Sequence, residues 1–275
     1  MKRAFLLCAM LAAAPLAAFS QGTAGVPLAG KLLITGSSTM APLIGELAKR
    51  FRARHPDVVI TVEAGGSGRG VKDALEGKAD IGMVSRELTS KERTLFAIPI
   101  ARDGVAFAVH KDNPVRGLTR AQALELFTGK IVNWKALGGV DARIEVVTRT
   151  PGHASLEIVS HYFDMDPGAI KAVRAVADST EAQRLVAENR NAITFLSAGA
   201  VEDAAQKGLP IKGIALNGKT PGISSIRDGS WPLSRSLNLV TRRVPAGVAK
   251  AFIEFALSPA AREAILEQDF VPYLN

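Results

Sequence analysis

The feature that most constrains the fold is an alternation of short apolar runs with longer segments of helical periodicity. An apolar run at 31–35 is followed by a segment at 42–54. In that segment Leu43, Leu47 and Phe51 fall on one face of a helix. The same alternation continues to the C-terminus and is typical of an α/β fold with parallel strands. Strands are expected at 31–35, 58–62, 79–84, 143–149, 192–197, 211–216 and 234–242, and helices at 42–54, 68–77, 119–127, 154–163, 181–188, a segment ending at 206, 246–257 and 259–268.

The middle of the chain suggests a division into two domains. Apolar runs at 96–100 and 104–110 close the first block, and polar turn residues follow at 110–117. This change from apolar to polar residues predicts that the chain passes from one domain to the other here. Without a leader, about 255 residues remain, which is enough for a large core in one or two domains.

Residues 1–20 are expected to be a secretory signal peptide outside the fold. Lys2 and Arg3 precede an apolar run at 4–16, and small residues at 18–20 suit a signal peptidase that cuts before Gln21. A retained membrane anchor is the alternative, although the run is shorter than a spanning helix requires. No later apolar stretch is long enough to span a bilayer.

Composition excludes several kinds of site. Cys8 is the only cysteine and lies inside the expected signal, so disulfides and cysteine-based metal sites are not expected. No two of the four histidines are four residues apart, which argues against a zinc site on a helix. The formal net charge of +8 suits nucleic acids, anionic surfaces or small anions. Scattered positive charges and few aromatic residues argue against nucleic acid.

Three junctions between a strand and a helix carry similar residues. The first contains Ser37, Ser38 and Thr39, the second surrounds Ser67 with glycines, and the third runs from Arg149 to the segment 152–155. Each alone is more often a plain helix cap than a binding site. Helix N-termini favour anions, and ligands of open α/β sheets lie beyond the carboxyl ends of the strands. The combination predicts a site for a tetrahedral oxyanion.

Enzyme motifs fail on inspection. Arg69 occupies the position where a G-x-S-x-G nucleophile elbow needs its last glycine, and Val71 stands where a P-loop needs lysine. A secreted phosphatase-like enzyme would depend on His153 and Ser155, and no orienting acid is evident beside them. We therefore expect a protein that is not an enzyme, without catalytic residues, cofactor or bound metal.

The motifs, taken in order, resemble those of a known family. They are ITGSSTMAPL, GGSGRGV, ADIGMVSREL, TGKIVNWKALGG, VVTR and WPLSRSL, and the resemblance runs from about residue 31 to the C-terminus. The family resembled is the phosphate-binding subunit family of bacterial ABC importers. The resemblance implies a two-lobed periplasmic binding protein of type II-like α/β fold, each lobe a mixed or parallel sheet flanked by helices. Lobe one is expected at 25–108 and 226–275, and lobe two at 109–225.

The resemblance also implies a function and a set of site residues. The protein would be a periplasmic monomer that captures inorganic phosphate and delivers it to an ABC permease driven by its ATPase, with no nucleic-acid partner. The implied ligand-binding residues are Ser38, Thr39 and Met40 in the first loop, Ser67 and Gly68 in the second, Ser85 and Arg86 in the third, and Arg149, His153, Ala154 and Ser155 in the fourth.

Two departures from the family pattern keep the choice of anion open. The family's fourth loop usually reads R-x-x-G-S-G-T-R, whereas this chain has His153, Ala154, Ser155 and Leu156 in its last four positions. Some members place an aspartate where this chain has Ser85, and a carboxylate there accepts the proton that hydrogen phosphate carries and sulfate lacks. Sulfate or molybdate is therefore the alternative ligand. A signalling or adhesion protein that reuses the fold is the alternative function.

Overall fold

The structure is a computed structural model that describes residues 28–274. It is a mixed α/β structure, as the alternation of apolar runs predicts. The expected signal peptide lies outside the described residues. Within residues 28–274, no helix combines the length and the apolar character that a membrane span requires.

The described strands and helices follow the expected order closely. The strands are β1 Gly30–Gly36, β2 Val58–Ala64, β3 Ile81–Val84, β4 Phe96–His110, β5 Gly117–Leu118, β6 Glu145–Arg149, β7 Arg174–Val176, β8 Ala192–Ser197, β9 Ile211–Leu216, β10 Ser234–Thr241 and β11 Val271–Pro272. The α-helices are α1 Ala41–Arg54, α2 Ser67–Glu76, α3 Arg120–Phe127, α4 Ala154–Phe163, α5 Ser179–Glu188, α6 Ala198–Gln206, α7 Ile223–Arg227, α8 Gly247–Leu257 and α9 Pro259–Leu266. Short 3₁₀ turns cover Ser90–Glu92, Trp134–Leu137 and Pro167–Ala169.

The sheet is mixed, with parallel strands at its two ends. Its main path is β2-β1-β3-β10-β4-β8-β6-β7. β1 pairs in parallel with β2 and β3, and β6 pairs in parallel with β7 and β8. The central strand β10 is antiparallel to both β3 and β4. The carboxyl ends of β1, β2 and β6, where the three loops begin, can therefore meet across the middle of the molecule.

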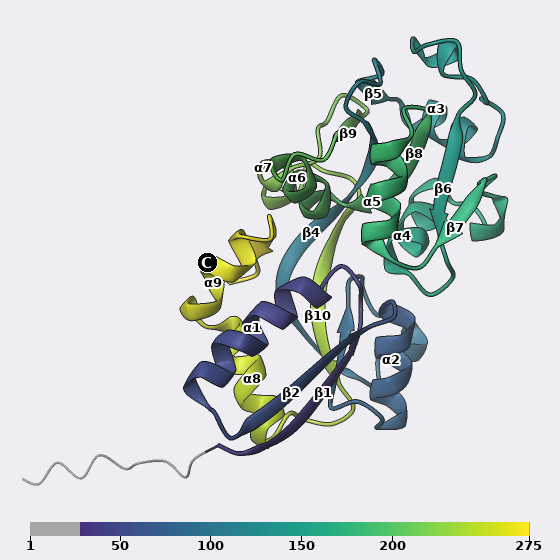
Figure 1. Ribbon diagram of the computed structural model, residues 1–275. Helices are drawn as coiled ribbons and strands as arrows, with labels where there is room; N and C mark the ends of the chain where they lie inside the picture. The colour runs from purple at the N-terminus through teal and green to yellow at the C-terminus, as the bar shows by residue number, and fades with distance from the viewer. Residues whose placement is uncertain (1–27, 275) are drawn as a thin grey trace, which may run out of the picture.

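β4 is one strand of 15 residues, where the sequence suggests two separate apolar runs. Its first part pairs with β10, from Phe96 to Gly104, and its second part pairs with β8, from Val105 to Val109. Figure 1 shows β4 and β10 running together between the lower and upper halves of the molecule. The two halves thus share a continuous pair of antiparallel strands.

Two large hydrophobic clusters fill the two halves. One is built around Phe51 and Phe252, and the other around Phe107 and Phe195. Within β4 the core changes from the first cluster to the second, and Trp231 joins the second cluster by donating its indole N–H to the Val105 carbonyl at 3.1 Å. We propose the expected lobe bounds, 25–108 with 226–275 and 109–225, with β4 and β10 crossing between the lobes.

Candidate functional site

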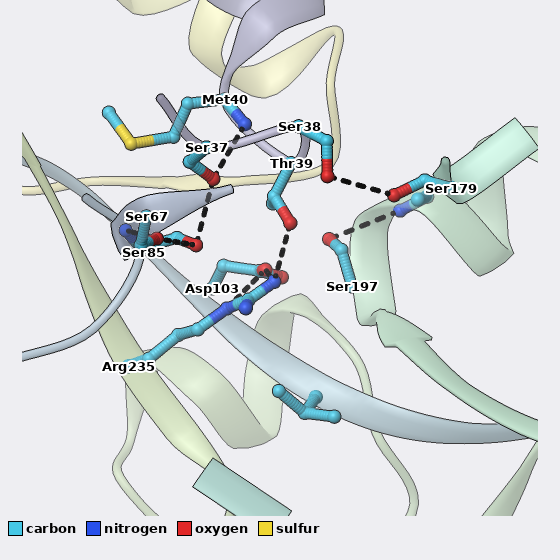
Figure 2. A network of polar contacts seen from close by, with 12 residues as sticks. Ser37, Ser38, Thr39, Met40, Ser67, Ser85, Asp103, Ser179, Ser197 and Arg235 are labelled. Atoms are coloured by element: carbon cyan, nitrogen blue, oxygen red, sulfur yellow. Dashed lines mark hydrogen bonds and ion pairs between the residues drawn. The ribbon is translucent and has the colours of Figure 1, made fainter. Parts of the chain in front are cut away.

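The first and second loops and the end of β3 meet in a buried cluster of hydroxyl groups. The Ser37 hydroxyl donates to the Ser85 hydroxyl at 2.8 Å, and the hydroxyls of Ser67 and Ser85 are 3.3 Å apart. The backbone N–H of Ser85 donates to the Ser67 hydroxyl at 3.0 Å. Figure 2 shows this cluster beside the start of α1. The three contact regions expected from separate strands are thus adjacent in the structure.

The first loop caps α1 mainly through Ser37. The Ser37 carbonyl accepts from the backbone N–H groups of Met40 and Ala41 at 3.2 and 3.1 Å, and its hydroxyl accepts from Met40 at 3.4 Å. The hydroxyls of Ser38 and Thr39 make contacts outside the loop, with Ser179 at 3.5 Å and with the Arg235 guanidinium at 3.2 Å. The Met40 side chain lies in the core. Capping therefore uses Ser37 and leaves the next two hydroxyls facing the middle of the molecule.

Arg149 is a buried cation at the end of β6. Its guanidinium donates to the carbonyls of Ala177 and Asp178 at 2.8 and 3.2 Å and to the Ser179 hydroxyl at 3.3 Å. Its Nε is buried and has no hydrogen-bond partner among the described residues. Burial lowers the pKa of Arg149 to about 10, against the opposing effect of the Asp178 charge. Arg149 stays charged at neutral pH and is suited to hold an anion.

The fourth loop places His153 at the N-cap of α4. The ring Nδ1 lies 3.0 Å from the Thr150 carbonyl and 3.1 Å from its hydroxyl, whereas the buried Nε2 has no hydrogen-bond partner within the described part of the chain. Burial, and then the positive charge of Arg149, lower the pKa of His153 below its ordinary value. Ala154 and Ser155 begin α4 and are buried. The start of α4 therefore faces the interior of the protein.

Several contacts join the two halves of the molecule around these loops. The backbone N–H of Gly68 donates to the Gly152 carbonyl at 3.0 Å, which holds the second loop against the fourth. Ser38 and Ser179 join the first loop to the start of α5. These contacts describe two lobes closed on each other.

The side chain of Arg86, an expected site residue, is held by two carboxylates. Its guanidinium forms a two-point ion pair with Glu92, at 2.7 and 2.9 Å, and a second ion pair with Glu157 of α4. Among residues 28–274, no hydrogen bond joins this guanidinium to the serine cluster. Since Glu157 belongs to the opposite half, Arg86 links the lobes at the rim.

Sequence reasoning did not assign two buried charged residues, Asp103 of β4 and Arg235 of β10. Their side chains are 0% and 1% exposed and form an ion pair, with the Arg235 Nη2 2.6 Å from the Asp103 Oδ2. Arg235 also reaches Thr39 of the first loop. Two features of the sequence point to this ion pair, namely a lone aspartate between two apolar runs and the arginine of the motif WPLSRSL. Ser179 was missed as well, because β7 and the start of α5 have little apolar character.

The described residues hold no cluster of three or more histidine, cysteine, aspartate or glutamate side chains that would suit a metal ion. The polar groups near the contact between the lobes are hydrogen-bond donors and positive charges. Buried hydroxyls, backbone N–H groups at helix starts and two guanidinium groups surround the junction of the lobes. Such donors suit a small anion with several oxygens.

Comparisons with known proteins agree with the fold of the chain. A family model described as "PBP superfamily domain" matches residues 21–260. The phosphate-binding protein PstS of Bacillus subtilis is 30% identical over 249 residues, which cover 88% of this chain and 81% of that protein. A putative phosphate ABC transporter substrate-binding protein with bound phosphate, from Clostridium perfringens, is 30% identical with a TM-score of 0.81, covering 88% of this chain and 99% of that one. An ABC-type phosphate transport receptor from Vibrio cholerae is also 30% identical, with a TM-score of 0.73 and coverage of 87% and 99%.

Proposed function

Since the chain belongs to the phosphate-binding protein family within the PBP superfamily, we propose that it captures inorganic phosphate for import by an ABC transporter. The observation that carries the proposal is the buried Arg149, placed among three helix starts at the contact between the lobes. A buried guanidinium needs acceptors, and a phosphate group offers several in a geometry that guanidinium donors match. The proposed ligand contacts are Ser38, Thr39, Met40, Ser67, Gly68, Ser85, Arg149, His153, Ala154 and Ser155, with Arg86 linking the lobes.

The proposal includes partners and a location. Two of the similar structures are described as a putative phosphate ABC transporter substrate-binding protein and an ABC-type phosphate transport receptor, so we propose an ABC permease and its ATPase as the partners. The expected signal peptide would bring the mature chain to the periplasm. Catalysis is not part of the proposal, since His153 directs Nδ1 to Thr150 and no hydrogen bond joins it to Ser155 in the described chain. That arrangement lacks the nucleophile–base contact that hydrolysis requires.

Calorimetric titration of the mature protein, freed of carried-over ligand, tests the function directly. We expect one phosphate per chain with a dissociation constant in the micromolar range or tighter, which corresponds to about 8 kcal/mol or more. Sulfate and molybdate, titrated in parallel, provide the comparison. If titration with millimolar phosphate releases or absorbs no heat, the proposal is refuted. If sulfate or molybdate binds more tightly than phosphate, that oxyanion is the ligand instead.

His153 is expected to leave the pH dependence of phosphate affinity unchanged near neutrality. Burial and the charge of Arg149 lower the pKa of its ring below the ordinary value of about 6.5, so the neutral form predominates as the pH falls from about 8 to about 6.5. Wild-type protein and His153→Ser should therefore show parallel affinity profiles over this range. An extra gain of affinity in the wild type as the pH falls would show that bound phosphate raises the pKa of the ring enough to charge it.

The same lowered pKa predicts an effect on folding stability. The unfolded chain takes up a proton at His153 as the pH falls through about 6.5, while the folded chain does so only at lower pH. Folding stability is thus lost as the pH falls through this window. Thermal unfolding without phosphate, at about pH 8 and about pH 5, should show a larger loss for the wild type than for His153→Ser. Equal losses of folding stability in the two proteins would contradict the lowered pKa of His153.

A further inference from the structure

The side chain of Arg86 lies between two carboxylates that belong to different halves of the molecule. Glu92, in the short 3₁₀ turn between β3 and β4, accepts two hydrogen bonds from the guanidinium at 2.7 and 2.9 Å. Glu157, in the first turn of α4, forms an ion pair with the Nε of the same guanidinium, without the alignment of a hydrogen bond. The side chains of Arg86, Glu92 and Glu157 are 9%, 15% and 36% exposed. Only the contact with Glu157 therefore depends on how closely the two halves approach each other.

Contacts within its own half fix the position of Arg86. The Asn238 side-chain amide of β10 donates to the Arg86 carbonyl at 2.9 Å. The carboxylate of Glu92 is itself held in place, because it accepts from the Thr89 backbone N–H at 2.8 Å. A guanidinium that is already in place loses little conformational freedom when a second carboxylate reaches it. The cation is therefore ready to pair with Glu157 when the two halves come together.

Glu157 lies close to the proposed phosphate site. Burial and the charge of Arg149 lower the pKa of His153, and the negative charge of Glu157 opposes them, so this carboxylate is near the fourth loop. A negative charge near a bound anion is unfavourable for binding. The ion pair with Arg86, in contrast, favours the closed arrangement of the two halves. The two effects of Glu157 on phosphate affinity thus have opposite signs, and an experiment can tell which one is larger.

We propose that Arg86 and Glu157 form a latch between the lobes, which holds the lobes closed and slows the release of phosphate without contacting the ion. This inference rests on the proposed function and deepens it by separating the residues that bind the anion from a pair that retains it. Arg86 directly follows Ser85 of the buried hydroxyl cluster, so the latch closes next to the site. Both members of the latch are positioning residues, which act on phosphate only through the closed arrangement of the lobes.

The Glu157→Gln variant tests the latch. Glutamine keeps the shape of the side chain and removes its charge, so the closed form loses the ion pair and phosphate affinity should fall about tenfold. Most of this change should be a faster dissociation of phosphate, because the ion pair forms only once the lobes have closed. Calorimetric titration measures the affinity, and stopped-flow tryptophan fluorescence measures the association and dissociation rates. A loss of affinity that comes only from slower association would overturn the proposal.

Glu181→Gln is the matched control. Glu181 lies in the first turn of α5, its side chain is 37% exposed, and its ion-pair partner, Arg174, belongs to the same half. Burial lowers the pKa of Arg149 and the charge of Glu181 opposes it, so this carboxylate also lies near the proposed site. The control should change phosphate affinity by less than about twofold. If Glu157→Gln binds phosphate as tightly as the control, or more tightly than the unchanged protein, the latch is overturned and the proposed function is left intact. Failure of phosphate to bind the unchanged protein would overturn both.

A double-mutant cycle tests whether Arg86 is the partner through which Glu157 acts. Arg86→Gln should weaken phosphate binding at least as much as Glu157→Gln, and adding Glu157→Gln to it should cause no further loss. Losses that multiply in the double variant would show that Glu157 acts independently of Arg86, which would overturn the latch. If Arg86→Gln does not fold because Glu92 is left without its partner, the comparison of Glu157→Gln with the control decides.

Discussion

The Arg149→Ala variant is expected to bind phosphate at least about 100-fold more weakly than the unchanged protein. Arg149 is 2% exposed, and its guanidinium is held in place by the carbonyls of Ala177 and Asp178 and by the Ser179 hydroxyl. Losing a buried, charged donor in a fixed orientation removes about 3 kcal/mol of binding free energy. Calorimetric titration with phosphate measures the difference.

Arg69→Ala is the matched control for Arg149→Ala. Arg69 follows the serine of the second loop, but its side chain is 39% exposed and forms ion pairs with Glu63 and Asp73. Exposed ion pairs contribute little, so this variant should change phosphate affinity by less than about threefold. Equal losses in the two variants, or a larger loss at Arg69, would contradict the assignment of Arg149 to the site.

The Gly66→Ala variant is expected to weaken phosphate binding by about 30-fold, because it prevents the lobes from closing fully. Gly66 has φ of 88°, and a Cβ there would lie 2.9 Å from the Gly152 carbonyl oxygen of the opposite half. The added methyl group would separate the second loop from the fourth and break the hydrogen bond from Gly68 to Gly152. Titration measures the affinity, and small-angle scattering with and without phosphate measures the closure.

Gly45→Ala is the control for this change. Gly45 lies within α1, and a Cβ there would meet no heavy atom within 4 Å. The control should bind phosphate normally and become more compact on binding, since alanine is favoured over glycine in a helix. If Gly66→Ala binds and closes like the control, the contact between the second and fourth loops does not limit closure.

Much of the fold could be predicted because its elements carry strong local patterns. α4 occupies 154–163 as expected. Its inward-facing residues, the last of which is Phe163, recur at helical spacing. The helix ends at Asp164, where the backbone is left-handed. β4 was not predicted as one strand, because Arg102 and Asp103 interrupt its apolar character. The residue that neutralises Asp103 lies 132 positions further along the chain. Only folding brings the two side chains together, so local sequence patterns predict neither the continuous strand nor its ion pair.

That the expected loops lie close together could also be predicted, whereas their contacts with a ligand remain a prediction. The three loops begin at strands with clear patterns, and the structure places the Ser85 hydroxyl within hydrogen-bond distance of the hydroxyls of both Ser37 and Ser67. Arg86 differs because its partners, Glu92 and Glu157, come from two other elements. The orientation of the Arg86 side chain depends on the positions of those two carboxylates, and the spacing of a sequence motif does not predict those positions. Ser179 was not found because a strand of three residues precedes it.

The continuous strands β4 and β10 have a mechanical consequence. With the proposed lobe bounds, they are the segments that would flex if the lobes separate, and we propose that they act as a hinge of two antiparallel strands. Asp103 and Arg235 belong to these strands and lie opposite each other in register. The buried ion pair between these two side chains therefore ties the two strands together at one point. A small change in twist at this point would be magnified with distance along each lobe and would displace the outer surfaces.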